Sequence, residues 1–353
     1  MGVEEKFLLL ADDGSVSPVA SRVVELAGLT EQIKPEFMSY QVETATAVCT
    51  RLDGLRRDLV RLRLTAADAA ERCGVQLVAS GAAPLTAHIA PARGGAARLD
   101  ELARRFPEAT AAGGMCACHV HIGLPDRDLA VAVLARIRPW LPALLALTVN
   151  SPFAAAQNTG WASYRYHSQL SWPTFRLPGA WADAERYDRA VQALIVSGAA
   201  LDTASVHLLA RLSARYPTIE VRVADTCLDV EDTVFYAGVV RALVASLVDD
   251  VRNRVKTMPA PAALIEAQLL TAAHGHLALR PDQSGSPSHL VPRLFDRVAP
   301  YLVADLADEV PAGLERLQRL GTGAERQRRM WTGQAGGFAR SLAEATVPVA
   351  ALR

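Results

Sequence analysis

Three short segments of this chain alternate between apolar and ionisable residues, and this alternation constrains the fold more than any other feature. The segments are "GVEEKF" at residues 2–7, "HVHIG" at 119–123 and "TIEVRV" at 218–223. Successive side chains of a β-strand point to opposite faces, so each segment predicts a strand with one apolar face and one ionisable face. A solvated polar face is the ordinary alternative, because antiparallel sheets often face water on one side.

We interpret the three ionisable faces together as the wall of an internal cavity, because solvated strands usually carry Thr, Ser, Lys and Gln instead. The side chains that the alternation places on these faces are Glu4, Lys6, His119, His121, Glu220 and Arg222. Carboxylates, imidazoles and a guanidinium in one cavity suit a hard cation bound together with a phosphate-bearing substrate.

The composition is that of a folded soluble protein in which any charged site must be local. Half of the 353 residues are hydrophobic and the formal net charge is zero, so no basic excess points to a nucleic-acid or membrane partner. The start "MGVEEKFLLL" is unlike a secretory signal, and the longest apolar run, "WLPALLALTV", is too short to span a bilayer. Five cysteines, an odd number, favour reduced thiols, so we expect a cytoplasmic protein.

The segment "CACHVH" at residues 116–121 has the residue types of a zinc cluster. Its spacing does not match a zinc finger, and no second cysteine pair follows elsewhere in the chain. We therefore expect Cys116 and Cys118 to be small buried residues on the apolar side of the strand.

Helical and strand patterns alternate irregularly along the chain. Helices are predicted over 15–33, 51–74, 129–149, about 230–255 and most of the last hundred residues, with a Gly-rich interruption at 321–329. Further strands are predicted at 75–80, 116–124 and 218–226, and no Gly-rich strand–turn–helix unit occurs, which favours an α+β domain on an antiparallel sheet. Residues 150–180 are predicted to form a long loop rich in aromatic, Arg and His residues, and such loops are often functional.

Six segments, in order from residue 2 to about residue 330, resemble one known family. They are "GVEEKF", "QVETAT", "CHVHIGLPDRD", "NSPF…NTGWASYR…WP", "TIEVRVADT" and "GTGAERQRR". Together they resemble the carboxylate–amine ligases related to glutamate–cysteine ligase type 2. The resemblance implies one glutamine-synthetase-like catalytic domain over residues 1–353, with a curved, mainly antiparallel sheet that forms a funnel, flanking helices and a mostly helical C-terminal third. It also implies ATP, Mg²⁺ or Mn²⁺, and amide formation through an acyl phosphate.

The same resemblance implies roles for individual residues. The residues implied to bind metal are Glu4, Glu43, His119 and Glu220. Arg222 is expected to contact the transferred phosphate, and Glu43 and Lys6 complete the expected catalytic set. Ser163 and Arg165 are expected to bind substrate, with Arg165 as the clamp for an α-carboxylate because a guanidinium pairs with a carboxylate through two hydrogen bonds.

Lys6 departs from the family pattern, which has an acidic residue at this position. An ammonium cannot serve as a ligand of Mg²⁺, so one metal position is affected. Lys6 could replace a cation by bridging Glu4 to Glu43 or Glu220, contact a phosphate directly, or extend to solvent. Alternatively, the chain is a divergent member with altered or lost ligase activity, either a ligand-binding pseudoenzyme or an ATP-independent amidohydrolase.

The leading hypothesis from the sequence is therefore an ATP-dependent carboxylate–amine ligase that acts on glutamate or a similar amino acid. No residue identifies the amine. The helix-rich last third has enough apolar residues to pack against a second copy, so a homo-oligomer remains open.

Overall fold

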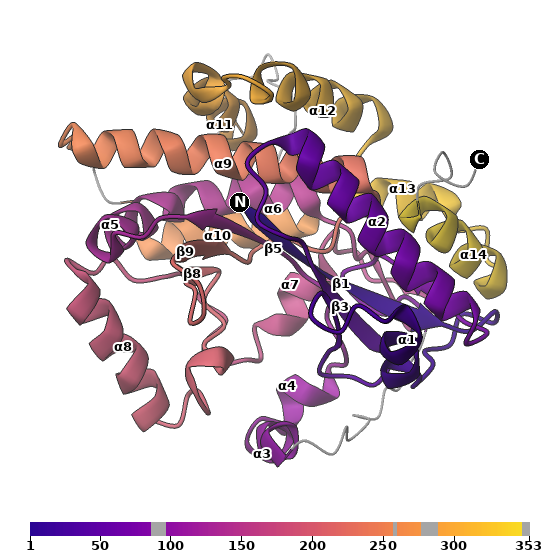
Figure 1. Ribbon diagram of the computed structural model, residues 1–353. Coiled ribbons are helices and arrows are strands. Elements are labelled where there is room, and N and C mark those ends of the chain that lie inside the picture. Colours follow the sequence, from indigo (N-terminus) through magenta and orange to yellow (C-terminus); the bar gives the residue numbers. More distant parts are fainter. Residues whose placement is uncertain (86–96, 257–259, 277–288, 348–353) are drawn as a thin grey trace.

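Figure 1 shows the computed structural model, which describes residues 1–85, 97–256, 260–276 and 289–347. Its main strands are β1 (Gly2–Leu10), β2 (Ile33–Pro35), β3 (Gln41–Ala45), β4 (Gln76–Val78), β5 (Cys118–Gly123), β8 (Ala210–Leu212) and β9 (Thr218–Val221). Within the described residues they form a seven-stranded sheet in the order β2-β3-β1-β5-β9-β8, with β4 also paired to β1. Every pairing in this open sheet is antiparallel, and the predicted α+β class is confirmed.

Strand β1 shows how the alternation works. Val3 and Phe7 are buried on the outer face, where helices cover them. The inner face changes character along the strand, because Glu4 and Lys6 line a cavity whereas Leu8 is buried in a separate apolar cluster. The polar cavity therefore ends where the inner face of β1 becomes apolar.

Helices α1 (Ala20–Ala27) and α2 (Leu52–Glu71) pack on the outer face of β1. The four leucines of α2 are buried at the predicted helical spacing, namely Leu52, Leu55, Leu59 and Leu62. The first predicted helix, over 15–33, is shorter than expected. Gly28 adopts φ 69°, a left-handed conformation that ends α1, and the chain then enters β2.

The predicted helix over 129–149 is divided into α5 (Arg127–Ile137), a 3-10 turn η1 (Arg138–Trp140) and α6 (Leu141–Thr148). Pro139 and Pro142 lie at this division. Proline has no N–H to donate to the preceding turn, so the two residues interrupt the helix. The stretch Arg127–Thr148 is the one in the described residues with the length and hydropathy of a membrane span. All eight residues of α6 are buried within the protein, as in a core helix.

Residues 150–180 are more ordered than the predicted structureless loop. They contain a short hairpin, β6 (Phe153–Ala154) and β7 (Gln157–Asn158), followed by α7 (Tyr164–Gln169). The hydroxyl of Ser163 begins α7 by accepting a hydrogen bond from the Tyr166 backbone N–H. Helices α3 (Ala97–Arg105) and α4 (Pro107–Ala111) and the turn η2 (Thr203–Ser205) lie near the cavity, and α8 (Ala184–Val196) packs against α5.

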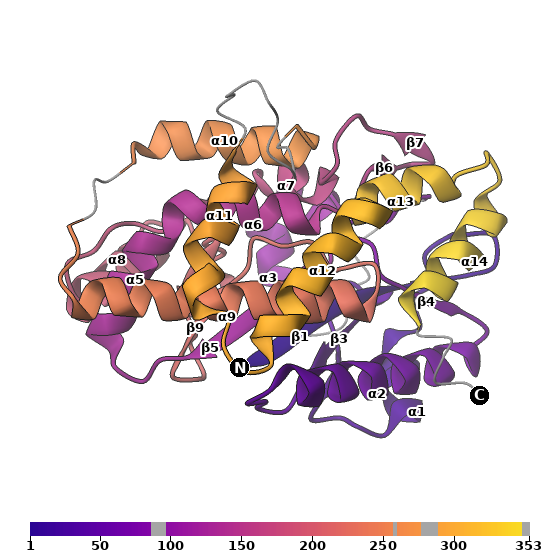
Figure 2. The same cartoon turned by 90° about the horizontal axis from the view of Figure 1, so that it is seen from above.

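The last third is mostly helical, as predicted. Its elements, with the long helix before them, are α9 (Val230–Arg252), α10 (Ala262–His274), α11 (Leu290–Val298), η3 (Ala299–Tyr301), α12 (Leu306–Leu320), α13 (Gly323–Met330) and α14 (Ala335–Thr346). Figure 2 shows α11 and α12 crossing α9, with α13 and α14 continuing toward β4. The predicted interruption at 321–329 is confirmed only at residues 321 and 322, because α13 begins at Gly323. Thr322 and Glu325 form a capping box that begins α13.

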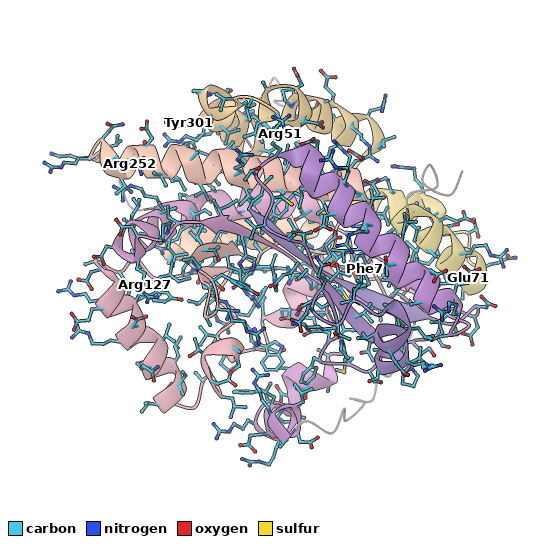
Figure 3. All side chains as sticks on the ribbon, in the orientation of Figure 1. Phe7, Arg51, Glu71, Arg127, Arg252 and Tyr301 are labelled. Atoms are coloured by element: carbon cyan, nitrogen blue, oxygen red, sulfur yellow. The ribbon has the colours of Figure 1, made fainter. Side chains whose placement is uncertain are left out.

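The distribution of side chains follows this architecture. Figure 3 labels Arg51, Arg127 and Arg252, each of which is exposed, and Phe7, which is fully buried inside the protein. Cys116 and Cys118 are buried and form no disulfide, as expected, but they do not share a strand face: Cys118 packs with Val120, whereas Cys116 precedes β5 and packs in the cluster that contains Leu8. The helices thus cover the outer face of the sheet, and its inner polar face is left to form the site.

Candidate active site

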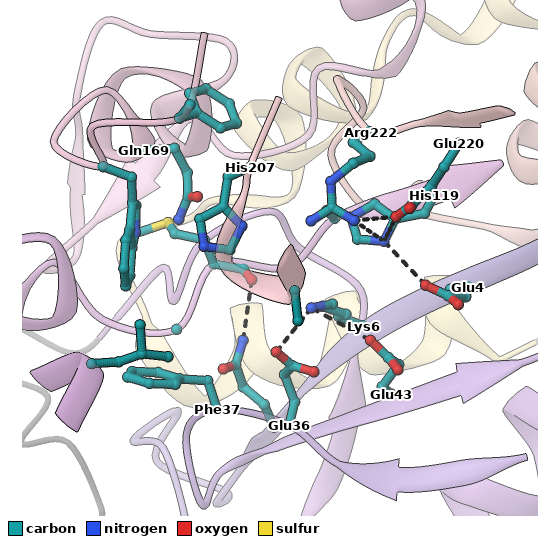
Figure 4. Close-up of a pocket in the computed structure, with 18 of the residues that line it drawn as sticks. Glu4, Lys6, Glu36, Phe37, Glu43, His119, Gln169, His207, Glu220 and Arg222 are labelled. Atoms are coloured by element: carbon teal, nitrogen blue, oxygen red, sulfur yellow. Dashed lines mark hydrogen bonds and ion pairs between the residues drawn. The ribbon is translucent and has the colours of Figure 1, made fainter. Parts of the chain in front are cut away.

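The polar face of the sheet lines a cavity of about 400 Å³ (Figure 4). Its lining includes the six ionisable residues of the alternating segments, namely Glu4, Lys6, His119, His121, Glu220 and Arg222. Leu99 on α3, Gln169 on α7 and Tyr216 before β9 contribute to the other walls. The alternative of a solvated strand face does not hold, because His119 and Glu220 are only 4% and 2% exposed.

Two carboxylates and two imidazoles meet where β1, β5 and β9 adjoin. Glu4 is opposite His119 in the strand register, and His121 is opposite Glu220. Nδ1 of His119 lies 3.2 Å from Glu4 Oε2 and 3.5 Å from Glu220 Oε1. One potential ligand atom each from Glu4, His121 and Glu220 lies within 4.8 Å of the other two. The structure therefore brings together three of the four residues expected to bind metal, and adds His121.

His121 supplies the clearest indication that this group fits a metal ion. Its Nδ1 lies 3.0 Å from the hydroxyl of Thr218, and its buried Nε2 makes no hydrogen bond within the described residues. If Nδ1–H donates to Thr218, the lone pair of Nε2 faces the carboxylates, as in metal-ligating histidines. Nε2 lies 3.5 Å from Glu4 Oε1. Buried polar atoms rarely remain unpaired, and a divalent cation between Glu4 and Glu220 would satisfy this one.

The electrostatics keep the carboxylates of this group ionised. Burial alone would raise the pKa of Glu4, but the imidazoles of His119 and His121 outweigh it and hold that pKa well below its usual range. Burial likewise opposes ionisation of Glu220, and Arg222 and Arg211 reverse the effect and lower its pKa. Burial, reinforced by the Arg222 charge, lowers the pKa of His119 to about 3, so this imidazole is neutral. Ionised carboxylates and neutral imidazole are the forms that bind metal.

Lys6 lies apart from this group and pairs with two other carboxylates. Its Nζ is 2.9 Å from Glu36 Oε1 and 3.4 Å from Glu43 Oε2 (Figure 4). Burial opposes the ammonium, but Glu36 and Glu43 outweigh it and raise the pKa of Lys6 above its usual value. Burial outweighs the attraction of Lys6 at Glu43 and, with the negative charge of Glu36, raises the pKa of Glu43 to about 8. Of the bridge considered between Glu4 and Glu43 or Glu220, only the contact with Glu43 forms, and Glu36 is the second carboxylate instead of Glu4 or Glu220.

Two guanidiniums contact Glu220 from different directions. Arg211 Nε lies 2.8 Å from Glu220 Oε2, while Arg222 Nη1 contacts Glu220 Oε1 and lies 3.4 Å from His119 Nδ1. Two positive groups thus share one carboxylate on the cavity wall. The excess positive charge suits the oxygens of a phosphate or a substrate carboxylate. His207 faces the same space, and burial together with Arg222 lowers its pKa well below the ordinary value.

The two residues expected to bind substrate are both tied to Asp225. Arg165 Nε donates to Asp225 Oδ1 at 2.8 Å, and Ser163 Oγ donates to the same atom at 2.7 Å. Oδ2 of Asp225 accepts from the Ser151 hydroxyl and from the Asn150 backbone N–H. Arg165 also lines the cavity, so its expected role stays a prediction. Ser163 is fully buried and is not part of the cavity lining, so the structure assigns it the capping of α7 instead.

Several residues of the site are missing from the sequence-based set. Glu36 and His207 lie outside regular strands, where no alternation marks a face. Arg211 lies between Ala210 and Leu212 in a three-residue strand, whose apolar–ionisable alternation is too short to stand out. Asp225 belongs to a segment that was used for the resemblance, but it follows the end of β9, so alternation does not place it. Tertiary contacts are needed to find these residues.

Comparison with known proteins agrees with the geometry. The model of glutamate–cysteine ligase family 2 matches residues 1–335. A Salinispora tropica protein provisionally named glutamate–cysteine ligase 2 is 43% identical over 345 residues, which cover 94% of this chain and 89% of that protein. A Mycolicibacterium vanbaalenii protein provisionally named glutamate–cysteine ligase 2-2 is 40% identical over 340 residues, which cover 94% of this chain and 93% of the relative.

Two solved structures share the fold at low sequence identity. Glutamate–cysteine ligase from Francisella tularensis in complex with AMP superposes with a TM-score of 0.68 at 14% identity, covering 99% of this chain and 90% of that one. A bifunctional glutathione synthetase from Pasteurella multocida gives a TM-score of 0.69 at 14% identity, covering 97% of this chain and about half, 52%, of that longer protein. The match along the whole chain and the arrangement of the sheet lead to one assignment: this chain belongs to glutamate–cysteine ligase family 2.

Proposed function

We propose that the protein is an ATP-dependent carboxylate–amine ligase that forms an amide through an acyl phosphate. The observation that carries the proposal is the convergence of Glu4, His119, His121 and Glu220 with Arg222 on one wall of the cavity. Family membership supports the general class of ligase. The cavity adds what this class of reaction needs, which is a place to neutralise and position a triphosphate.

The chemistry explains the composition of the wall. A carboxylate is a poor electrophile, so the γ-phosphoryl group of ATP is first transferred to the substrate carboxylate and ADP leaves. The amine nitrogen then attacks the acyl carbon, loses a proton, and inorganic phosphate departs. The protein contributes mainly positioning and electrostatic stabilisation of charge on the phosphoryl oxygens.

We assign each group by its position. Glu4, His121 and Glu220 would hold Mg²⁺ or Mn²⁺, with His119 in contact with both carboxylates, and the ion would supply charge neutralisation to the polyphosphate. Arg222 lies directly beside this group, so its guanidinium can donate to oxygens of the transferred phosphoryl group. Arg165 reaches the cavity from α7 and remains our candidate for holding the substrate carboxylate.

Phosphate release tests the proposal. The full chain is incubated with ATP, Mg²⁺, glutamate and a panel of amines, including cysteine, and inorganic phosphate is followed. We expect phosphate release that depends on an amine, and its loss in Glu4→Gln. Glu185→Gln, an exposed change of the same kind on α8, should leave the rate unaltered. Absence of amine-dependent phosphate together with absence of nucleotide binding by calorimetry would overturn the proposal.

A second candidate is a nucleotide-binding member of the family that no longer ligates. The ion pairs of Lys6 favour it, because they occupy two carboxylates of the cavity. The variant Lys6→Glu separates the two candidates. Ligation that occurs only in Lys6→Glu supports loss of activity in the parent, whereas a parent faster than the variant supports a working ligase. An amidohydrolase would instead cleave amides without nucleotide.

We further propose small amino-acid substrates in the cytoplasm, with neither nucleic acid nor membrane as a partner. The neutral net charge and the size of the cavity are consistent with this assignment. Measuring the molecular mass of the protein in solution shows whether two copies associate.

A further inference from the structure

We propose that the ammonium of Lys6 takes the place of a divalent cation between Glu36 and Glu43, so that the cavity binds one divalent cation, at Glu4, His121 and Glu220. The inference deepens the proposed function and rests on it only in taking this cavity as the site of metal and nucleotide binding. It concerns how the charge of the site is divided between the metal and the protein itself.

The position of Lys6 carries the first step. Lys6 is directly opposite Glu43 in the register of β1 and β3, so the two side chains extend from the same face of the sheet. Glu36, from the segment that follows β2, approaches from the other side, and Nζ lies within 3.4 Å of an oxygen of each carboxylate. The Lys6 side chain is only 15% exposed, so it does not extend to solvent. The ammonium is thus held where two carboxylates converge.

The second step is that an ammonium and a divalent cation exclude each other there. A metal ion needs ligands that offer a lone pair, which an ammonium lacks, and Glu36 and Glu43 are the oxygen donors that Lys6 contacts. A divalent cation bound to both carboxylates would have to displace the ammonium of Lys6. The ammonium would then lose its two counter-charges and be repelled by the nearby cation. The positive charge of Lys6 already balances part of the negative charge that would attract a metal to this pair.

The third step is that the group formed by Glu4, His121 and Glu220 can still bind a metal ion. Glu4 contacts the imidazoles of His119 and His121, and no ion pair joins it to Lys6 within the described residues. His121 is 7% exposed, its Nε2 is without a hydrogen bond in the described chain, and its Nδ1 is held by Thr218. A buried, oriented nitrogen without a hydrogen bond among the described residues, 3.5 Å from a Glu4 oxygen, has the geometry of an open ligand position, and Glu220 lies beside it with its oxygens shared with Arg211 and Arg222.

Metal stoichiometry tests this division of charge. Mn²⁺ alone is titrated into the full chain, and free Mn²⁺ is measured by electron paramagnetic resonance after equilibrium. We expect one bound Mn²⁺ per chain in the parent and two in Lys6→Glu. Lys6→Gln, which removes the ammonium without adding a carboxylate, should also bind two, the second at least tenfold more weakly. Lys6→Arg, which keeps the charge, should bind one.

Two further variants serve as controls. Lys256→Glu makes the same change of charge at an exposed residue beyond α9, and its stoichiometry should remain one. Glu4→Gln should weaken the single parental site at least tenfold. Circular dichroism confirms that each variant is folded before titration. Two Mn²⁺ bound to the parent, or one bound to both folded Lys6→Glu and folded Lys6→Gln, would overturn the inference.

The test is independent of the proposed ligation. One Mn²⁺ in the parent without amine-dependent phosphate release would retain the inference and remove the proposed function. Ligation by a parent protein that binds two Mn²⁺ would support the proposed function and overturn the inference.

Discussion

Glu4 and Glu5 are neighbours in the chain but have opposite environments. Glu4 faces the cavity, whereas Glu5 is fully buried on the outer face of β1 and pairs with Arg63 of α2. The Arg63 guanidinium also donates to the backbone carbonyls of Cys227 and Thr346. This buried pair therefore ties β1 to α2 and to the C-terminal end of α14, and it supports the strand that carries Glu4 and Lys6.

Replacing Arg63 with Met should destabilise the protein by about 3–5 kcal/mol, because Glu5 would be left buried without its counter-charge. The free energy of unfolding is measured in urea. Arg57→Met on the same helix is the control, since the side chain of Arg57 is 75% exposed and its loss should cost less than about 0.5 kcal/mol. A loss below about 1 kcal/mol for Arg63→Met would contradict the assigned role of the pair.

Arg222→Lys should lower kcat for ligation by about 10²–10³-fold, because lysine keeps the charge but loses the planar set of donors. Phosphate release at saturating substrate measures the change. Arg189→Lys, on the exposed surface of α8, should not alter kcat. An unchanged kcat in folded Arg222→Lys would place this guanidinium outside the reaction.

At the scale of elements, α13 joins the C-terminal helices to the loop that follows α6. Gln327 Nε2 donates to Asn150 Oδ1 at 2.8 Å, and the Asn150 side chain donates to the carbonyls of Ala79 and Thr226. Gly323, the first residue of α13, packs so closely on Asn150 that an added Cβ would overlap the amide group. The segment "GTGAERQRR" thus has a structural role in positioning the loop that reaches Asp225.

Two Gly→Ala substitutions should therefore have opposite signs. Gly323→Ala should cost about 1–3 kcal/mol because it overpacks against Asn150. Gly337→Ala should instead stabilise the protein by about 0.4–1 kcal/mol, since Gly337 is helical, has no heavy atom within 4 Å of an added Cβ, and loses chain entropy on folding. Urea unfolding of both variants checks the pair. Equal effects at the two glycines would refute the proposed close packing at Asn150.

Element-level prediction succeeded where one local pattern decided the structure. The leucine spacing of α2 and the alternation of β1 each needed only their own residues. The loop over 150–180 was mispredicted because its order depends on Asp225, a residue about sixty positions away that accepts hydrogen bonds from Ser163 and Arg165. Such long-range partners leave no periodic signal in the segment itself.

In the whole molecule, the cavity is lined by the sheet and by elements from distant parts of the chain, including α3 and α7. A ligand bound there contacts several elements that separate on unfolding. Ligand binding should therefore stabilise the entire fold by mass action.

ATP with Mg²⁺ at about one hundred times its dissociation constant should add about 2.7 kcal/mol to the free energy of unfolding. Thermal unfolding with and without ligand measures the gain. At the same concentrations Glu4→Gln should gain much less, because one carboxylate of the metal group is lost, and exposed Glu185→Gln should gain as much as the parent. Identical gains in parent and Glu4→Gln would show that the nucleotide binds without this group.

Local alternation was enough to predict which side chains share a strand face, because it is a property of extended backbone. It thereby placed Glu4 with Lys6, His119 with His121, and Glu220 with Arg222. How these pairs combine depends on long-range packing. Strand order set Glu4 beside His119, and the segment after β2 brought Glu36 to Lys6, because contacts between distant segments depend on how the chain packs. The local pattern specified the faces, and packing of the whole chain selected the partners across them.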